Sequence, residues 1–326
     1  FGFKNNNDFN GTDQEGFGQY QVNIKNGKRF SAADAFLKPI ANRPNLDILT
    51  NTLVEKIIIS NKKVIGVKIS NKKFSGVIGC SSELILSGGS INSPQILMLS
   101  GIGPKNHLKK YQIALVHDLP GVGQNLQDHL DILTHNECLK PVTDAKYVMG
   151  PFGFLKQAFI LGQWATTSKG PGSWIGLSTT AFLKTHESLD LPDIQMHYIG
   201  ALLQDHGKTL PDSHCFSNHI CLLRPESRGY VALKTLDPRD HPIIQPNYFA
   251  TQKDRDTLIK GVKMSREIMN QSAFDEYRGK EMTPGVHVQT DAEIEEFIRN
   301  AAETIYHPVG TCKMGSDEFA VVDDKL

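Results

Sequence analysis

Runs of branched apolar residues separated by turn signals occupy the first part of the chain. Residues 53–59 and 64–69 are rich in isoleucine and valine and flank Asn61 and Lys62, a pattern that predicts a β-hairpin. Residues 83–87 form another short apolar run, which we expect to be a buried parallel strand. A helix is predicted to follow over about residues 92–100, so this region has a strand, turn and helix rhythm.

The pattern changes after about residue 131. Short alternating segments at 194–199, 217–223 and 229–234 are typical of an antiparallel sheet with one buried face. Residues 254–269 place apolar side chains on one side of a helix. Thr290 and Glu293 have the spacing of a capping box, which predicts a second helix ending near residue 302. The sequence therefore predicts a second domain, in which helices pack on an antiparallel sheet.

The turn after residues 83–87 contains Gly88 and Gly89 and leads directly into a predicted helix. Glycines leave the backbone bare, and the unpaired amide groups of a helix N-terminus attract a phosphate or pyrophosphate. Close packing of a strand against a helix would also explain these glycines. The turn alone leaves both interpretations open.

Composition excludes several classes of protein. The chain has 326 residues, and its 35 lysines and arginines balance 35 aspartates and glutamates, which argues against broad electrostatic capture of nucleic acid or of an anionic membrane. It has no apolar run long enough to span a membrane. Its 12 histidines lack metal-binding spacings, and its 5 cysteines lack a CxxC pair. We therefore expect no metal site, and free thiols in a reducing compartment.

Five blocks along the chain resemble, in order, those of the glucose-methanol-choline (GMC) oxidoreductases, flavoproteins that oxidise alcohols. Residues 88–103, GGSINSPQILMLSGIG, resemble the second signature of that family. The other blocks are LPGVGQNLQDH at 119–129, PESRG at 225–229, PNY at 246–248 and YHPVGTCKMG at 306–315. Within the family, the sequence looks most like bacterial choline dehydrogenases and related FAD-dependent alcohol dehydrogenases.

The resemblance implies an α/β plus antiparallel β fold. Residues 1–131 would be part of a Rossmann-like FAD-binding domain with a linker, residues 132–300 a substrate-binding domain built on an antiparallel sheet packed by helices, and residues 301–326 a return segment. The N-terminal GxGxxG strand of the family has no counterpart in this sequence. The second active-site residue of the family, a histidine or asparagine, would follow residue 326. We therefore expect a fragment of a longer protein, with an incomplete FAD-binding domain.

His307, in the last block, is the catalytic candidate. Alcohol oxidation requires that the hydroxyl proton be removed, or the forming alkoxide stabilised, while a hydride leaves the carbon for the flavin. An imidazole that titrates near neutral pH can perform either role. His129 is a second histidine in a family block, and we expect it to have a structural role because its neighbours Asn125 and Asp128 are typical of turns.

The resemblance also implies which residues bind FAD and substrate. The backbone of Val54 would contact the adenine, and Ser87 and Gly88 would lie near the ADP half of the cofactor. His197, on a predicted strand, matches a histidine that lines the pocket of choline-oxidising relatives. A structural histidine with hydrogen-bond partners in the sheet is an equally good interpretation of His197.

The family resemblance predicts FAD-dependent oxidation of a primary alcohol to an aldehyde, with electrons passed to a quinone-type acceptor or the respiratory chain. A quaternary ammonium needs a carboxylate or an aromatic cage. Residues 145–186 contain no aspartate or glutamate, and Ser178 aligns where choline-oxidising relatives have a glutamate, which favours an uncharged alcohol. The alternative is choline dehydrogenase, which converts choline to betaine aldehyde. More distant alternatives are a flavin-fold lyase and an inactive fragment. We expect a cytoplasmic protein and leave peripheral attachment to the inner membrane open.

Overall fold

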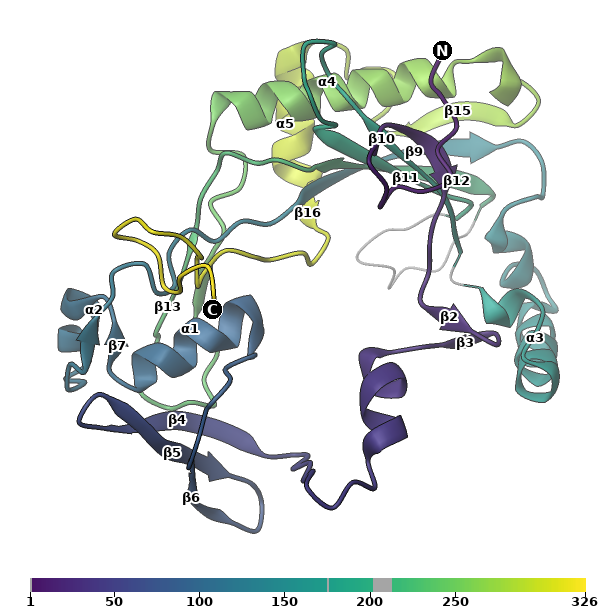
Figure 1. The fold of residues 1–326 in the computed structure, drawn as a ribbon. Coiled ribbons are helices and arrows are strands. Elements are labelled where there is room, and N and C mark those ends of the chain that lie inside the picture. Colours follow the sequence, from purple (N-terminus) through teal and green to yellow (C-terminus); the bar gives the residue numbers. More distant parts are fainter. Residues whose placement is uncertain (1, 175, 202–212) are drawn as a thin grey trace. The chain divides into compact units, whose positions relative to one another are not determined.

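The computed structural model describes residues 2–174, 176–201 and 213–326 and divides the chain into two compact units (Figure 1). Each unit is assembled from three separate stretches of sequence. Unit 1 consists of Phe1–Leu46, Leu130–Arg224 and Thr251–Thr304. Unit 2 consists of Asp47–His129, Pro225–Ala250 and Ile305–Leu326.

Unit 1 is built on a sheet that has seven antiparallel strands within the described residues. Strand β9 pairs with three neighbours, because β15 and β16 both lie along the edge that β12 does not occupy. The strand order is β1 (Gly16–Gln19), β10 (Leu177–Leu183), β11 (Ile194–Ile199), β12 (Cys215–Leu222), β9 (Leu130–Cys138) and β15 (Arg278–Thr283), and β16 (Glu303–Thr304) also pairs with β9.

Helix α4 (Gln252–Met269) lies across one face of this sheet (Figure 1). Alternate residues of the strands point toward it, as the period of two requires, so Ala181, Ile194 and Met196 are fully buried in a core that includes Ile268 of the helix. Helix α5 (Asp291–Ala301) packs beside α4 and begins with the capping box formed by Thr290 and Glu293. The predicted helices and the antiparallel sheet are therefore confirmed.

The remaining elements of unit 1 are short, apart from α3 (Gly153–Thr167). They are β2 (Ile24–Lys25), β3 (Lys28–Arg29), η1 (Ala33–Leu37), η2 (Lys38–Ile40), η3 (Asp144–Tyr147), η4 (Pro171–Ser173) and η6 (Ser272–Phe274). Among the described residues, no helix combines the length and apolar character needed to cross a membrane.

Unit 2 contains the predicted hairpin, which is formed by β4 (Leu53–Ser60) and β5 (Lys63–Ser70). Asn61 and Lys62 both adopt positive φ, 48° and 61°, as a two-residue hairpin turn requires. A third strand, β6 (Ser75–Gly79), pairs with β5. The other elements are α1 (Gly89–Leu99), β7 (Ile102–Gly103), α2 (Lys105–Lys110), β8 (His117–Asp118), β13 (Tyr230–Ala232) and β14 (Ile243–Gln245).

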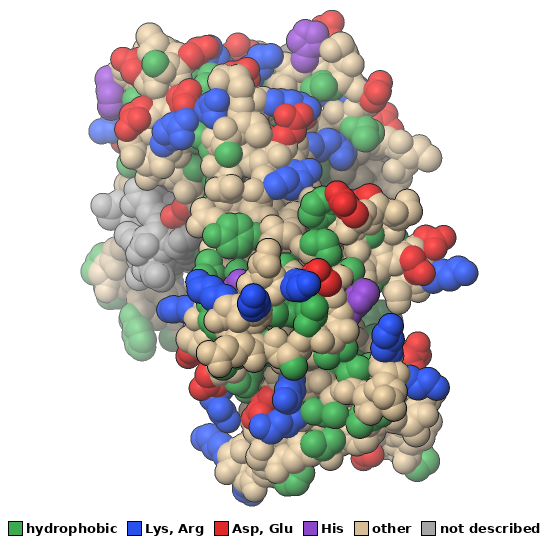
Figure 2. Space-filling model, turned by 90° about the vertical axis from the view of Figure 1, so that its left-hand side faces the viewer, with side chains coloured by type: hydrophobic (Ala, Val, Ile, Leu, Met, Phe, Trp, Pro, Cys, Tyr) green, Lys and Arg blue, Asp and Glu red, His purple; other side chains and the backbone are tan. Residues whose placement is uncertain are grey.

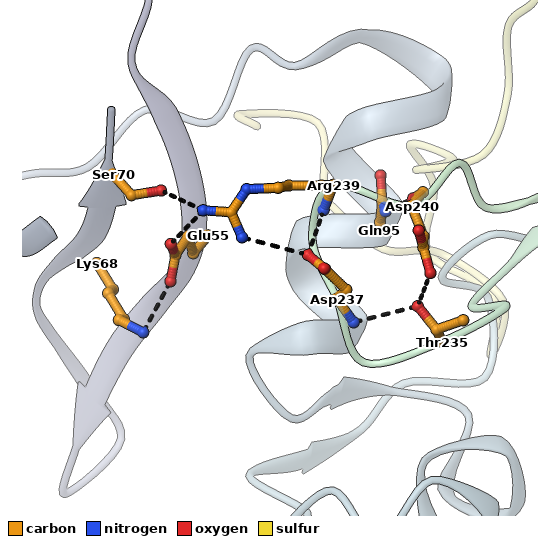
Figure 3. Close-up of polar contacts among 8 residues, drawn as sticks. All are labelled: Glu55, Lys68, Ser70, Gln95, Thr235, Asp237, Arg239 and Asp240. Atoms are coloured by element: carbon orange, nitrogen blue, oxygen red, sulfur yellow. Dashed lines mark hydrogen bonds and ion pairs between the residues drawn. The ribbon is translucent and has the colours of Figure 1, made fainter. Parts of the chain in front are cut away.

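A polar network ties the hairpin of unit 2 to α1 and to the loop after β13 (Figure 3). The guanidinium of Arg239 donates to Ser70 Oγ at 3.4 Å and lies 3.9 Å from the carboxylate of Glu55. From the same loop, the carbonyl of Asp240 accepts a hydrogen bond from Gln95 of α1 at 2.9 Å. Three segments that are distant in sequence are therefore held together beside the start of β4.

Two expectations about strands are wrong. Residues 83–87 form no strand, and Ile85 is 80% exposed, because within the described chain no other strand lies beside them to form a parallel ladder. The segment 229–234 contributes β13, which pairs with β14 in unit 2 and not with the large sheet. Its place in unit 2 follows from backbone hydrogen bonds between Gly123 and Val231 and between Leu126 and Gly229.

The units also divide the sequence differently from the expected domain ranges. Residues before Leu46 belong with the large sheet, because β1 pairs with β10 from Gly16 opposite Phe182 to Gln19 opposite Thr179. Residues 225–250 belong with unit 2, as does the return segment from Ile305 onward. The antiparallel sheet therefore includes a strand from the start of the chain.

Candidate active site

His307 lies in a loop of unit 2 whose backbone is fixed on both sides. Tyr306, just before it, has a positive φ of 64°, a conformation that non-glycine residues rarely adopt. After it, Val309 exchanges backbone hydrogen bonds with Gln127 in an antiparallel bridge. Gly310 has φ 97°, and a Cβ there would lie 2.4 Å from the carbonyl oxygen of Asn125, so the close approach requires glycine. The imidazole itself is exposed.

Asp128 is the residue that anchors this loop. The residue is 8% exposed, and its Oδ1 accepts backbone hydrogen bonds from His307 N at 2.8 Å and from His129 N at 2.9 Å. Its second oxygen, Oδ2, accepts a hydrogen bond from the hydroxyl of Tyr248. A single buried carboxylate therefore joins the 119–129 block, the 246–248 block and the 306–315 block.

His129 lies directly beside the catalytic candidate. Its Nδ1 is 3.4 Å from Nδ1 of His307, and the two rings meet edge to face with centroids 5.4 Å apart. In a hydrogen bond between them, one Nδ1 carries a proton and donates it, and the other Nδ1 accepts. Which Nδ1 donates determines the tautomer of each ring. The sequence interpretation gave His129 a structural role and missed this contact, although its place in a family block with Asp128 was the available signal.

The loop of His307 is joined to the start of α1. Ser90 Oγ donates to the carbonyl of Pro308 at 2.5 Å, and Thr311 Oγ1 donates to the carbonyl of Ser90. Two reciprocal hydrogen bonds therefore connect the glycine-rich helix start with the residues that follow His307. This places the predicted catalytic loop and the predicted phosphate-binding turn in one assembly within unit 2.

The start of α1 fits the anionic part of FAD. The helix has 11 residues and begins after Gly88, and no side chain in the described chain caps its first amide groups. Gly89 has φ 77°, and no described atom lies within 4 Å of the position that a Cβ would occupy there. Ser87 is exposed beside it. Bare backbone, open space and free amides are what a pyrophosphate requires.

Val54 also lies in unit 2, near the beginning of β4. It is opposite Ile69 of β5 and is half-buried, and the strand register shifts immediately after it. Further along β4, Ser100 Oγ at the end of α1 accepts a hydrogen bond from Ile57 N at 2.8 Å. Val54, Ser87 and Gly88 are therefore carried by elements that pack on one another.

His197 belongs to unit 1, on β11. Its Nδ1 is hydrogen-bonded to the hydroxyl of Tyr20, and the two rings stack with centroids 5.7 Å apart and an angle of 12°. Burial raises the pKa of Tyr20 well above its ordinary value, so the phenol keeps its proton. Gln195, two residues earlier on the same face of the strand, donates to Thr180 Oγ1 at 3.1 Å.

Two further polar residues next to His197 were not singled out from the sequence. His219 of β12 is directly opposite His197, with ring centroids 6.2 Å apart, and its Nδ1 lies 2.5 Å from Oδ2 of Asp131. The Asp131 side chain is only 2% exposed. Within the described residues, Asp131 Oδ1 and His219 Nε2 are buried and lack hydrogen-bond partners, so a polar ligand group would be stabilised there. Only the contact across strands could have revealed this pair.

The structure thus groups the predicted residues in two sets. His307, Val54, Ser87 and Gly88 lie in unit 2, and His197 lies in unit 1. No cluster of three or more histidine, cysteine, aspartate or glutamate side chains in the described part of the chain could hold a metal ion. Unit 2 therefore carries the candidate acceptor of the hydroxyl proton and the candidate turn for binding the cofactor. Unit 1 carries the candidate residues for lining a substrate pocket.

Comparisons with known proteins identify relatives over nearly the whole chain. It is 42% identical to an oxygen-dependent choline dehydrogenase of Brucella ovis and 41% identical to the mitochondrial choline dehydrogenase of Mus musculus, over 99% of this chain in each case. The chain spans 58% and 54% of the length of these relatives. The structure is similar to pyridoxine 4-oxidase from Mesorbium loti, with a TM-score of 0.86, 28% identity and coverage of 100% of this chain and 59% of that one.

Family models give the same result. The GMC oxidoreductase N-terminal model matches residues 1–131, and the C-terminal model matches residues 225–326. Together they cover well over half of the chain, including the loop of His307 and the start of α1. The chain therefore belongs to the GMC oxidoreductase family.

Proposed function

We propose that the full-length protein uses FAD to oxidise a primary alcohol to its aldehyde, with choline as the preferred substrate and betaine aldehyde as the product. The reaction class is supported by the hydrogen bonds that join Ser90, at the start of α1, to the loop of His307. The choice of choline is supported by the 42% identity to the choline dehydrogenase of Brucella ovis. Because this chain spans 58% of that relative, the proposal concerns the longer protein.

In this reaction the alcohol loses a proton from its hydroxyl and a hydride from its carbinol carbon. FAD, when bound, supplies the hydride acceptor. His307 accepts the proton at Nε2, which requires that its Nδ1–H donate to Nδ1 of His129, 3.4 Å away. Asp128 holds the backbone of both histidines, so that the imidazole of His307 keeps its direction.

Residues of unit 2 would also hold the cofactor. The uncapped amides that follow Gly88 would face the ADP half of the cofactor, with Ser87 beside them. Val54 would contact the adenine through its backbone. These three positions are proposed from the family resemblance, and the open space at Gly89 supports them.

His197 is proposed to line the substrate pocket, with Tyr20 fixing the orientation of its ring. The sequence argued against choline because residues 145–186 contain no carboxylate. The structure weakens that argument, because Asp131 supplies a buried carboxylate beside His219, the cross-strand neighbour of His197. The side chain of Asp131 is therefore the proposed partner of a quaternary ammonium.

A second candidate is oxidation of an uncharged primary alcohol. It is favoured by the lack of acidic residues over 145–186, where Ser178 takes the place of a glutamate. The side chain of Ser178 lies outside the described residues. The two candidates differ only in whether the pocket recognises a positive charge.

Steady-state kinetics of the full-length protein distinguish the candidates. We expect kcat/KM for choline to exceed that for 3,3-dimethylbutan-1-ol, its uncharged isostere, by about tenfold or more. Equal values would overturn the choline preference and leave the reaction class intact. Flavin absorbance after anaerobic addition of the alcohol tests the class itself. Bleaching supports oxidation, and an unchanged spectrum with product formed would indicate lyase chemistry.

The electron acceptor is proposed to be of the quinone type, with electrons passed on to the respiratory chain. The name of the Brucella ovis relative includes "oxygen-dependent", so molecular oxygen is the competing acceptor. Rates with a water-soluble quinone in the absence of oxygen, compared with oxygen uptake alone, decide between them. We propose a cytoplasmic location for the protein.

A further inference from the structure

One face of the large sheet in unit 1 carries a buried pair of titratable side chains, Asp131 and His219. Asp131 of β9 is opposite Cys221 of β12, and His219 comes two residues before Cys221, so the two side chains are diagonal neighbours on one face. His219 Nδ1 lies 2.5 Å from Asp131 Oδ2, and the side chains are 16% and 2% exposed. The apolar core with Met196 and with Ile268 of α4 lies on the other face of the sheet.

The ion-pair partner of the Asp131 carboxylate is a histidine. Strands β9, β11 and β12 contain no lysine or arginine, and no such side chain in the described part of the chain pairs with Asp131. The helix side of the same sheet differs, because there Arg266 of α4 pairs with Glu281 at 2.9 Å and an arginine keeps its charge. On the surface drawn in Figure 2, cationic and anionic side chains are interspersed as well. The negative charge of Asp131 is therefore balanced by a group that can lose its proton.

Other titratable groups lie on the same face around the pair. From the strands packed beside it they are Cys221 of β12, Glu303 of β16, His197 of β11 and His135 of β9. Cys221 and Glu303 are directly opposite Asp131 on its two neighbouring strands, and His197 is directly opposite His219. Because two of these groups are also histidines, a titration on this face has to be assigned by substitution.

The charge of Asp131 reaches the side chains that are proposed to line the substrate pocket. Burial is the main cause of the raised pKa of Tyr20, and Cys221 and Asp131 add to it electrostatically. Tyr20 is the hydrogen-bond partner of His197 Nδ1. The buried carboxylate, His219 and the pair of Tyr20 and His197 therefore form one polar region of unit 1.

Protonation of His219 changes the net charge of this region. When Asp131 is ionised, its pair with a neutral His219 carries one negative charge, and a proton on His219 cancels that charge. Nε2 of His219 is the atom that takes the proton, because Nδ1 already carries the hydrogen that it donates to the carboxylate. A quaternary ammonium beside Asp131 and this proton are two positive charges at one buried carboxylate. Each therefore weakens the binding of the other by the same factor.

We infer that His219 is a specificity-determining residue that makes the preference for a cationic substrate depend on pH. Neutral His219 leaves the charge of Asp131 available to a quaternary ammonium, and protonated His219 neutralises that charge. The inference rests on the choline oxidation proposed above, with Asp131 as the partner of the ammonium. His219 acts on substrate recognition through Asp131 and takes no part in the transfer of the hydride.

The pH dependence of kcat/KM in the full-length holoenzyme tests the inference, with choline and its uncharged isostere 3,3-dimethylbutan-1-ol as the two substrates. The ratio of the two kcat/KM values cancels the titration of His307 and of any other group that acts equally on both alcohols. We expect this ratio to fall about tenfold between about pH 8 and about pH 5.5, mainly through KM for choline, because the proton and the cation exclude each other. This measurement on the wild type needs no substitution.

Two variants assign the effect to the pair. In His219→Asn the side-chain amide takes the place of Nδ1–H as the donor to Asp131 and does not titrate, so the ratio should stay constant with pH. Asp131→Asn removes the charge, so the two alcohols should have equal kcat/KM values at each pH. His186→Asn is the matched control, because His186 is an exposed histidine of the same unit, and it should keep the wild-type fall.

A constant ratio in favour of choline in the wild type would overturn the role of His219 and leave the choline preference intact. An equal fall in the wild type and in His219→Asn would also overturn it, and would assign the titration to another group such as His135 or His197. Equal kcat/KM values for the two alcohols at every pH in the wild type would instead show that the choline preference itself is wrong, and the inference would fail with it.

Discussion

The two histidine sites are held in different ways. His307 lies in a loop of unit 2, and what fixes it is its backbone, through Asp128, the bridge to Gln127 and the turn at Tyr306. His197 lies in a strand of unit 1, and what fixes it is its side chain, through Tyr20 and the sheet. A residue held by its backbone presents an exposed ring for chemistry, whereas one held by its ring is better suited to shaping a pocket.

The largest effect should follow from His307→Ala. Loss of the proton acceptor should lower kcat of the full-length protein by about a hundredfold or more, because general base catalysis contributes about that much. The flavin should stay bound, since the loop backbone and the start of α1 do not depend on the imidazole. Stopped-flow flavin reduction under anaerobic conditions measures the loss directly.

His117→Ala is the control for the loss of an exposed histidine from unit 2, and it should leave kcat unchanged. Turnover near the wild-type value in His307→Ala would remove this residue from the mechanism. The comparison of the two sites would then have to be reversed, with His197 as the candidate base.

Asp128→Ala tests whether the backbone of the loop is what matters. The change removes the acceptor of two backbone N–H groups and of the Tyr248 hydroxyl, and each buried donor left unpaired costs about 1–3 kcal/mol. We expect kcat to fall about tenfold, with a lower melting temperature. An unchanged rate of flavin reduction would show that the loop keeps its geometry without the carboxylate.

The parts of the fold that were predicted correctly have signals within a few residues in the sequence. The β4–β5 hairpin is determined by its Asn61-Lys62 turn, and the start of α5 by Thr290 and Glu293, which are three residues apart. The parts of the fold that were missed depend on pairing between strands that are distant in sequence. Strand β1 joins the large sheet through β10, more than 150 residues later, and residues 83–87 require a parallel neighbour that the described chain lacks.

The same distinction applies to the candidate site. His307 was found because its family block surrounds it in the sequence. The contact of His307 with His129 joins residues 178 positions apart, and the pairing of His219 with Asp131 joins residues 88 positions apart. His129 had its place in a family block as a signal, but that signal does not say which residue it contacts. The pair of Asp131 and His219 has no local pattern in the sequence, so it could not be predicted.

His197→Ala should have a smaller effect than the changes in the loop. If the strand residue shapes the pocket, kcat/KM for choline should fall by roughly tenfold, mainly through KM, while the rate of flavin reduction at saturating substrate changes little. Tyr20→Phe, which keeps the stacked ring and removes the hydroxyl, should change KM in the same direction by less. A large fall in the rate of flavin reduction in His197→Ala would show that the sheet histidine also takes part in the chemistry.

The smallest effect concerns the pH dependence of unit 2 stability. His107 Nε2 accepts a hydrogen bond from Leu233 N at 3.0 Å, and burial, with a smaller contribution from Lys110, lowers the pKa of His107 below its ordinary value of 6.5. Protonation removes the acceptor, so the stabilisation is present above about pH 6.5 and is lost as the pH falls through the lowered pKa. In His107→Gln the amide oxygen accepts the same hydrogen bond without titrating. Between pH 7.5 and pH 5, the melting temperature of the wild type should therefore fall by roughly 1–2 °C more than that of the variant. Parallel melting curves would show that the loops of unit 2 are held independently of His107.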